Sequence, residues 1–354
     1  MTATQRATAD WMMRKNLLAG LIIAMLWGIL GVTVPLRAIA AEQTSQAAHD
    51  LLAQMDDAFV RLSYDGVFSY FSGNDLATLR VVHKVVDGVQ RERLVHLNGA
   101  PREIIRQGED VSCLVMPGDD LLALADSIPA GPFARAFVRQ FERLSTSYLV
   151  DHYGEGRVAG RPAIRIGVSP LDQHRYGYRL WLDKATSLLL RSELVDADGN
   201  KLEIFQFTQL QLGDAVTVAD LEPQEVSGST VSHMRLETGA ADLSAAASEP
   251  ASQAAAWETT WLPNGFEMAT ADIRRKPAHA VTNLVYSDGL AAFSIFIEPM
   301  PETGAASMVS QNGATVALTH RVGGQEGYHL VTLVGEIPVA TAHEIIKSVK
   351  QKSL

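Results

Sequence analysis

The sequence predicts an α+β protein with one large, open antiparallel β-sheet that carries helices, followed by a smaller C-terminal β-rich domain with a terminal helix. Three observations lead to this fold class. Short runs of β-forming residues follow one another, and several are separated by Asp-Gly or Asn-Gly pairs, which favour hairpins. Helical periodicity is confined to three segments. Strands do not alternate with helices as they do in a parallel α/β sheet.

The N-terminus has the features of a secretory signal. Two basic residues precede an uncharged apolar run over 17–34, and Ala38 and Ala40 have the spacing that a signal peptidase recognises. We therefore expect cleavage before Ala41, with 1–40 as the signal peptide, and a mature protein in the periplasm. The run is also long enough for a retained membrane anchor, which stays the alternative.

Residues 41–236 are predicted to form the large sheet with its helices. Residues 47–62 place their apolar side chains on one face of a helix. The ten runs predicted as strands are Tyr64–Ser72, Leu76–Val86, Val89–Leu97, Arg102–Gln107, Val111–Val115, Tyr148–Tyr153, Ala163–Val168, Tyr176–Asp183, Leu188–Val195 and Leu202–Leu212.

An aromatic stripe at helical spacing interrupts these strands at 131–144. A curved sheet with an apolar helix across its mouth would form a hydrophobic cavity for a lipid chain, so this domain is expected to sense a lipid. A core filled by side chains fits the same periodicity. The residues that we expect to bind the lipid are Phe68, Tyr70, Phe133, Phe137, Phe141 and Trp181.

Residues 237–256 are small and polar, which predicts a flexible linker of about 25 Å root-mean-square span. Residues 257–354 then form the second domain, in which Pro338 begins a final helix. We expect a groove between the two domains to hold a peptide. The five runs predicted as strands are Trp257–Arg275, Val281–Tyr286, Leu290–Ile297, Ala314–Val322 and Tyr328–Val334.

Arginines gather in both domains of an acidic chain. Guanidinium groups suit bidentate recognition of anions, so we expect these arginines to bind lipid phosphates or an acidic peptide. The alternative is that they form a solvated strand face. We assign Arg274, Arg275 and Arg321 to partner binding. The two groups are Arg91, Arg93, Arg102 and Arg106 in the first domain, and Arg274, Arg275, Lys276 and Arg321 in the second.

Composition and motifs exclude several classes of function. The formal net charge is −10, and about −13 without residues 1–40, which argues against a general nucleic-acid binder. The single cysteine, Cys113, has apolar neighbours and is expected to be buried. Ser287-Asp288-Gly289 fits a hairpin turn rather than a nucleophile with its base. With no nucleotide-binding or hydrolase motif and no ligand spacing among the histidines, we predict no enzymatic activity, no metal and no cofactor.

Several short segments, in order along both domains, together resemble the MucB/RseB family of negative regulators of envelope-stress sigma factors. The likeness covers essentially all of the mature chain. The segments are Tyr64–Phe68, Arg91–Arg93, Leu97–Gly99, Arg102–Arg106, Tyr178–Asp183, Trp261–Phe266, Tyr286–Leu290, Phe293–Glu298 and Val334–Pro338.

The resemblance implies a large domain similar to the lipoprotein carriers LolA and LolB, followed by a smaller domain. It also implies a partner, the periplasmic segment of a transmembrane anti-sigma factor of the MucA/RseA type, which the protein would shield from the site-1 protease. Lipid or lipopolysaccharide would release it. No short family motif carries functional residues position by position, so the residues assigned above rest on their own chemistry.

Two other classes of function remain as alternatives. A periplasmic lipid or lipoprotein carrier of LolA type would use the same cavity for cargo, but it would need no counterpart of residues 257–354. A hydrolase would require a nucleophile, a base and an oxyanion site, which the sequence does not present. Whether the protein forms a homo-oligomer is left open.

Overall fold

The computed structural model describes residues 36–99, 101–108, 110–115, 147–223, 230–235, 256–275, 280–300, 307–324 and 327–352. The chain divides into two compact units after Gln46, and both β-sheet domains belong to the second unit. The described residues contain two α-helices, α2 (Leu36–Arg61) and α5 (Val339–Ser348).

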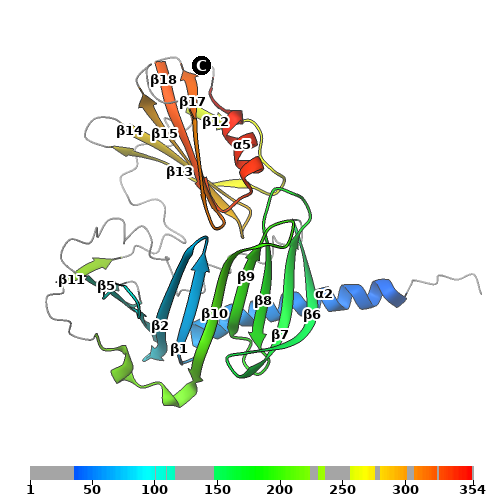
Figure 1. Ribbon diagram of the computed structural model, residues 1–354, viewed down its shortest axis with the longest axis vertical. Helices are drawn as coiled ribbons and strands as arrows, with labels where there is room; N and C mark the ends of the chain where they lie inside the picture. Colours follow the sequence, from blue (N-terminus) through cyan, green and yellow to red (C-terminus); the bar gives the residue numbers. More distant parts are fainter. Residues whose placement is uncertain are drawn as a thin grey trace, which may run out of the picture. The chain divides into compact units, whose positions relative to one another are not determined.

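An antiparallel sheet of 11 strands forms the first domain (Figure 1). Its strands are β1 (Tyr64–Ser72), β2 (Asp75–Val86), β3 (Val89–His96), β4 (Glu103–Gln107), β5 (Asp110–Val115), β6 (Tyr148–Val158), β7 (Arg161–Pro170), β8 (Gly177–Asp183), β9 (Leu189–Val195), β10 (Lys201–Leu212) and β11 (Thr230–Arg235). They lie in the order β11-β5-β4-β3-β2-β1-β10-β9-β8-β7-β6. Because β11 and β6 are edges that do not pair with each other, the sheet is open, which confirms the predicted fold class.

The hairpin between β2 and β3 shows why the turn residues predicted this sheet. Asp87 and Gly88 both have positive φ angles, of 52° and 78°, and they connect the paired residues Val86 and Val89. A two-residue hairpin turn of this kind requires positive φ at both positions, which Asp and Gly tolerate. The predicted Asp-Gly turn is confirmed.

The part of α2 that follows Gln46 covers one face of this sheet. Its apolar positions, including Leu52, Met55 and Phe59, are almost fully buried. They belong to one hydrophobic cluster with Phe68 of β1 and Phe205 of β10, whose rings lie 4.9 Å apart. The predicted apolar face of the helix over 47–62 is therefore confirmed, and Cys113 is buried as expected.

A buried histidine lies beside this core. The ring of His83 is fully buried, stacks on Tyr64 with 4.9 Å between centroids, and donates from Nδ1 to the carbonyl of Leu62 at 2.8 Å. Its Nε2 has no hydrogen-bond partner among the described residues. Burial lowers the pKa of His83, against the opposing effect of the hydrogen bond to Leu62, so the folded protein holds this ring neutral.

We expect His83 to make the first domain less stable in acid. The unfolded chain binds a proton on this ring below its ordinary pKa of about 6.5, whereas the folded chain does not, so the free energy of unfolding falls as pH drops below that value and levels off above it. The loss for one proton reaches up to about 1.4 kcal/mol at pH 5.5. The free energy of unfolding, measured with urea at pH 7.5 and 5.5, should differ less between the two pH values for His83→Gln than for the unchanged protein. For the exposed His152→Gln this difference should not become smaller. Equal pH dependence in all three proteins would contradict this assignment.

The second domain contains a smaller antiparallel sheet with α5 packed on it. Its strands are β12 (Trp257–Thr259), β13 (Glu267–Arg275), β14 (Ala280–Ser287), β15 (Ala292–Met300), β16 (Ser307–Asn312), β17 (Thr315–Gly324), β18 (Gly327–Gly335) and β19 (Val349–Gln351). Six of them form a sheet in the order β13-β14-β15-β18-β17-β16, and β12 pairs with β19. Ala342, Ile345 and Ile346 of α5 are buried in its core, which confirms the predicted terminal helix after Pro338.

The single strand predicted over Trp257–Arg275 is wrong, because the structure divides it into β12 and β13. Between them, Phe266 donates from its backbone N–H to the carbonyl of Pro263 at 3.2 Å, and Gly265 has a φ of 86°, which an L-residue with a side chain rarely adopts. This turn lies between the end of β12 at Thr259 and the start of β13 at Glu267. The strands β11, β16 and β19 were not predicted.

Three predicted segments lie wholly or largely outside the described residues. These are the apolar run over 17–34, the aromatic stripe with Phe133, Phe137 and Phe141, and the linker, of which only Ala256 is described. The cleavage expected before Ala41 stays a prediction. In the described part of the chain, no helix has both the length and the apolar character needed to cross a membrane.

Candidate functional site

The carboxylate of Asp288 joins residues of the two domains. Asp288 follows β14, and its Oδ1 accepts the backbone N–H groups of Leu290 and Ala291 at 2.9 and 2.8 Å, as the predicted hairpin turn implies. Its Oδ2 accepts from two residues of the first domain, Arg175 through Nε at 2.6 Å and the Tyr148 hydroxyl at 3.0 Å. The side chains of Arg175 and Asp288 are 1% and 0% exposed. The carboxylate of Asp288 therefore stabilises its own turn and also accepts a hydrogen bond from a buried cation.

Further contacts surround this ion pair. Arg175 also bonds to Asp172 and to the backbone carbonyl of Asn264, so its guanidinium spans both domains. Tyr176 donates its hydroxyl to the carbonyl of Ile337 at 3.2 Å. These buried polar contacts hold the two domains together. Separation of the domains would break these contacts.

The residues expected to bind a lipid do not all lie together. Phe68 is fully buried between Phe205 and Phe207, and Tyr70, on the same strand, donates its hydroxyl to Glu203 Oε2 at 2.8 Å. Phe133, Phe137 and Phe141 lie outside the described residues.

Trp181 is separated from Phe68 by the sheet itself, so the expected grouping of these two residues is corrected. Leu180 and Leu182 of β8 belong to the cluster that contains Phe68, and Trp181 lies between them in sequence. Since neighbouring residues of a strand face opposite sides, Trp181 projects from the other face.

The arginines assigned to partner binding lie on one sheet but not in one cluster. Arg274 and Arg275 end β13, an edge strand, where they pair with Val281 and Ala280 of β14. Arg321 lies on β17, and its guanidinium stands 4.6 Å from the centre of the Tyr328 ring. Three strands separate β13 from β17, which places the two backbones about 19 Å apart at about 4.8 Å per strand.

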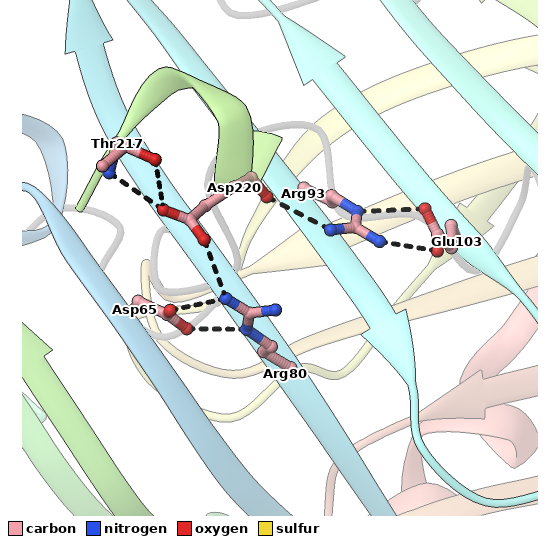
Figure 2. A network of polar contacts seen from close by, with 6 residues as sticks. All are labelled: Asp65, Arg80, Arg93, Glu103, Thr217 and Asp220. Carbon is pink, nitrogen blue, oxygen red and sulfur yellow. Dashed lines mark hydrogen bonds and ion pairs between the residues drawn. The ribbon is translucent and has the colours of Figure 1, made fainter. Parts of the chain in front are cut away.

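Arg93, from the arginine group of the first domain, is committed to an internal network (Figure 2). Its guanidinium makes two hydrogen bonds to the buried Glu103, at 3.0 and 2.7 Å, and a third to the carbonyl of Asp220 at 3.2 Å. Arg80 likewise joins Asp65 to the Asp220 carboxylate. The network fixes the short helix η3 (Val218–Leu221) against β2 and β3, so Arg93 serves the fold rather than an external anion.

A pocket of about 810 Å³ opens on the face of the first sheet from which Trp181 projects. Arg165, Arg179, Arg191 and Lys201 line it together with Trp181. These cations were not predicted from the sequence, although Arg179 and Trp181 alternate with the buried Leu180 and Leu182, which is the pattern of a strand with one solvent-facing side. No group of residues suited to hold a metal ion occurs within the described ranges.

Comparison with known proteins matches both domains. The family model described as MucB/RseB N-terminal domain matches residues 47–226, and the MucB/RseB C-terminal domain model matches residues 251–350. Sigma factor AlgU regulatory protein MucB of Pseudomonas aeruginosa is 36% identical over 324 residues, 90% of this chain and 95% of that protein. Sigma-E factor regulatory protein RseB of Escherichia coli K12 is 28% identical over 326 residues, 90% of this chain and 95% of that protein. A chain in the solved complex of Pseudomonas aeruginosa MucA and MucB is 35% identical, with a TM-score of 0.71, and the alignment covers 87% of this chain and 100% of that one.

Proposed function

The chain belongs to the MucB/RseB family, and we propose that it is a non-enzymatic periplasmic regulator that binds the periplasmic segment of a transmembrane anti-sigma factor. The observation that carries this proposal is the similarity, across both domains, to a chain of the MucA/MucB complex. Binding along an extended peptide would shield the peptide from the site-1 protease. A lipid or lipopolysaccharide signal would then release the regulator.

The C-terminal sheet is the proposed surface for the partner. Arg274 and Arg275 lie at one edge, and three strands lie between them and the strand that carries Arg321, so a peptide of about six extended residues would reach from one group to the other. Charge-assisted contacts with acidic side chains would hold the peptide across the strands. Each of these contacts would contribute modestly, and the three together would set both affinity and salt dependence.

We expect joint replacement of Arg274, Arg275 and Arg321 by Ala to weaken binding of the anti-sigma segment by about tenfold and to reduce its dependence on salt, because exposed ion pairs each contribute up to about 1 kcal/mol. Calorimetric titration of a synthetic segment at two salt concentrations measures both effects. The matched control replaces Arg61, Arg157 and Lys347, which are exposed and carry the same total charge. Equal loss of affinity in the two triple variants would refute the assigned surface.

A lipid is proposed as the releasing signal, with Phe68 and Tyr70 at the apolar face of the first sheet and Phe133, Phe137 and Phe141 closing over it. Phe68 is already packed against other rings, so a bound acyl chain would have to displace them. The alternative of a simple lipid carrier is less well supported, because the family match extends over the second domain. Steady turnover of ester or lipid substrates would contradict the non-enzymatic role.

A further inference from the structure

Two carboxylates, one from each domain, interact at the junction where the domains touch. Glu336 follows β18 in the second domain, and the next residue, Ile337, accepts a hydrogen bond from Tyr176 of the first domain. Glu203 lies on β10 of the first domain, close enough for its negative charge to act on Glu336. Two groups of the same charge therefore meet across the junction.

Glu203 is held in place by its own domain and lies beside a turn of the other. Its Oε2 accepts from the Tyr70 hydroxyl at 2.8 Å, and its Oε1 accepts from the Ser72 hydroxyl at 3.1 Å. Gly313, in the turn between β16 and β17, approaches Ser72 so closely that a Cβ there would lie 2.5 Å from the Ser72 Oγ. Glu203 itself is buried. Its carboxylate cannot turn away from Glu336 without losing both hydrogen bonds.

The groups that surround this pair add negative charge and no compensating cation. The negative charges of Glu336, Glu203 and Asp288 all act on the phenol of Tyr178 on β8, so three carboxylates gather around one side chain. Asp288 is paired with the buried Arg175. Neither glutamate has an ion pair with a Lys, Arg or His among the residues that the structure describes. The charge of Glu336 is thus opposed from the neighbouring domain.

Glu336 is the group of this cluster whose charge changes near neutral pH. Partial loss of hydration and, second, the charge of Glu203 raise the pKa of Glu336 to about 7. Burial and the nearby carboxylates also raise the pKa values of Tyr70 and Tyr178, so both phenols stay protonated. Glu336 keeps contact with solvent, so a proton reaches it directly from water.

From this arrangement we infer that the junction is a pH-sensitive switch, in which protonated Glu336 lets the two domains close and ionised Glu336 opposes their closure. Closure with an ionised Glu336 brings two like charges together where water is partly excluded. Separation of the domains returns both carboxylates to water. The inference goes beyond the proposed regulatory function, and it is tested without the anti-sigma segment or a lipid, so the two stand or fall separately.

Proton linkage gives the direction of this switch. The closed arrangement, with a pKa of about 7 for Glu336, retains a proton that the open arrangement, with the ordinary value of 4.5, releases. Closure is therefore favoured most below pH 4.5, and this advantage is lost as pH rises through 7. Between pH 6.0 and 8.5 the ratio of closed to open molecules should fall by up to about tenfold, and by less where solvent screens the pair.

Hydrogen exchange of the whole protein measures this ratio even when open molecules are rare. The amides of Leu290 and Ala291 report on opening, because Leu290 packs against the core of the first domain and Ala291 is buried. Their protection, corrected for the intrinsic effect of pH on exchange, should fall several-fold and up to about tenfold from pH 6.0 to 8.5. Amides in the middle of β10 serve as the reference and should keep their protection. Equal protection of the junction amides at the two pH values overturns the inference.

Variants identify the group that titrates. Glu336→Gln should keep the protection of the junction amides at pH 8.5 as high as at pH 6.0, and Glu203→Gln should reduce the pH dependence in part. The matched control is Glu344→Gln, an exposed position on α5 of the same domain, which should retain the full pH dependence. Melting curves confirm that each variant is folded.

His174 is the competing titratable group, because its Nδ1 lies 3.1 Å from the Thr341 hydroxyl of the second domain. We expect His174→Gln to retain the pH dependence of the unchanged protein. If Glu336→Gln keeps the full pH dependence, the inference is overturned. If His174→Gln then loses it, the switch belongs to the histidine.

Discussion

Asp288→Asn is expected to destabilise the junction between the two domains by about 3 kcal/mol, because the Arg175 guanidinium would lose its fully buried anionic partner. This loss of stability is smaller than the largest losses caused by breaking a buried ion pair, because Arg175 keeps its contacts with Asp172 and Asn264. The single unfolding transition should separate into two as the domains uncouple. Urea unfolding followed by far-UV circular dichroism, together with limited proteolysis of residues 237–256, measures both effects.

The matched control for this prediction is Asp172→Asn, which affects the same arginine. Asp172 is 29% exposed and belongs to the same domain as Arg175, so its replacement should cost less than about 1 kcal/mol and leave one transition. If the two variants lose equal stability, the contact of Arg175 with Asp288 across the domains stabilises the protein no more than its contact with Asp172 does. A single cooperative transition in Asp288→Asn would show that other contacts hold the domains together.

The sequence predicted the local role of Asp288 but not its contact with the first domain. An Asp-Gly turn after a β-rich run explains the bonds from Leu290 and Ala291. Arg175 and Tyr148, which complete the site, lie 113 and 140 positions away. No periodicity or spacing connects residues so distant in the sequence, and only the packing of two domains brings them together.

The face on which Trp181 lies could have been predicted. Arg179 and Asp183 flank an alternation in which Leu180 and Leu182 are the apolar members, so the tryptophan shares its side with the charged residues. Assigning Trp181 to a lipid pocket gave its aromatic character more weight than its position. In β16, by contrast, all six residues are exposed, so no alternation marks this edge strand.

Breaking the buried pair between Arg93 and Glu103 is expected to have the largest effect on the first domain. Glu103→Leu would leave the Arg93 guanidinium buried with only the Asp220 carbonyl as a partner in the network of Figure 2, at a cost of about 3–5 kcal/mol in the free energy of unfolding. The double variant Arg93→Met with Glu103→Leu removes both charges and should recover most of that loss, because neither ion is left without its counterion. Urea unfolding of the two single variants and the double variant gives their coupling energy.

The exposed pair of Arg61 and Asp57 on α2 provides the control for this cycle. Its side chains are 74% and 55% exposed, so the same cycle there should give a coupling energy below about 1 kcal/mol. A double variant at Arg93 and Glu103 that is as unstable as Glu103→Leu alone would show that the loss comes from altered packing. The buried charges would then not be its cause. In that case η3 would be held against the sheet by the apolar contacts of Val216 and Leu221 with Val82 and not by Arg93.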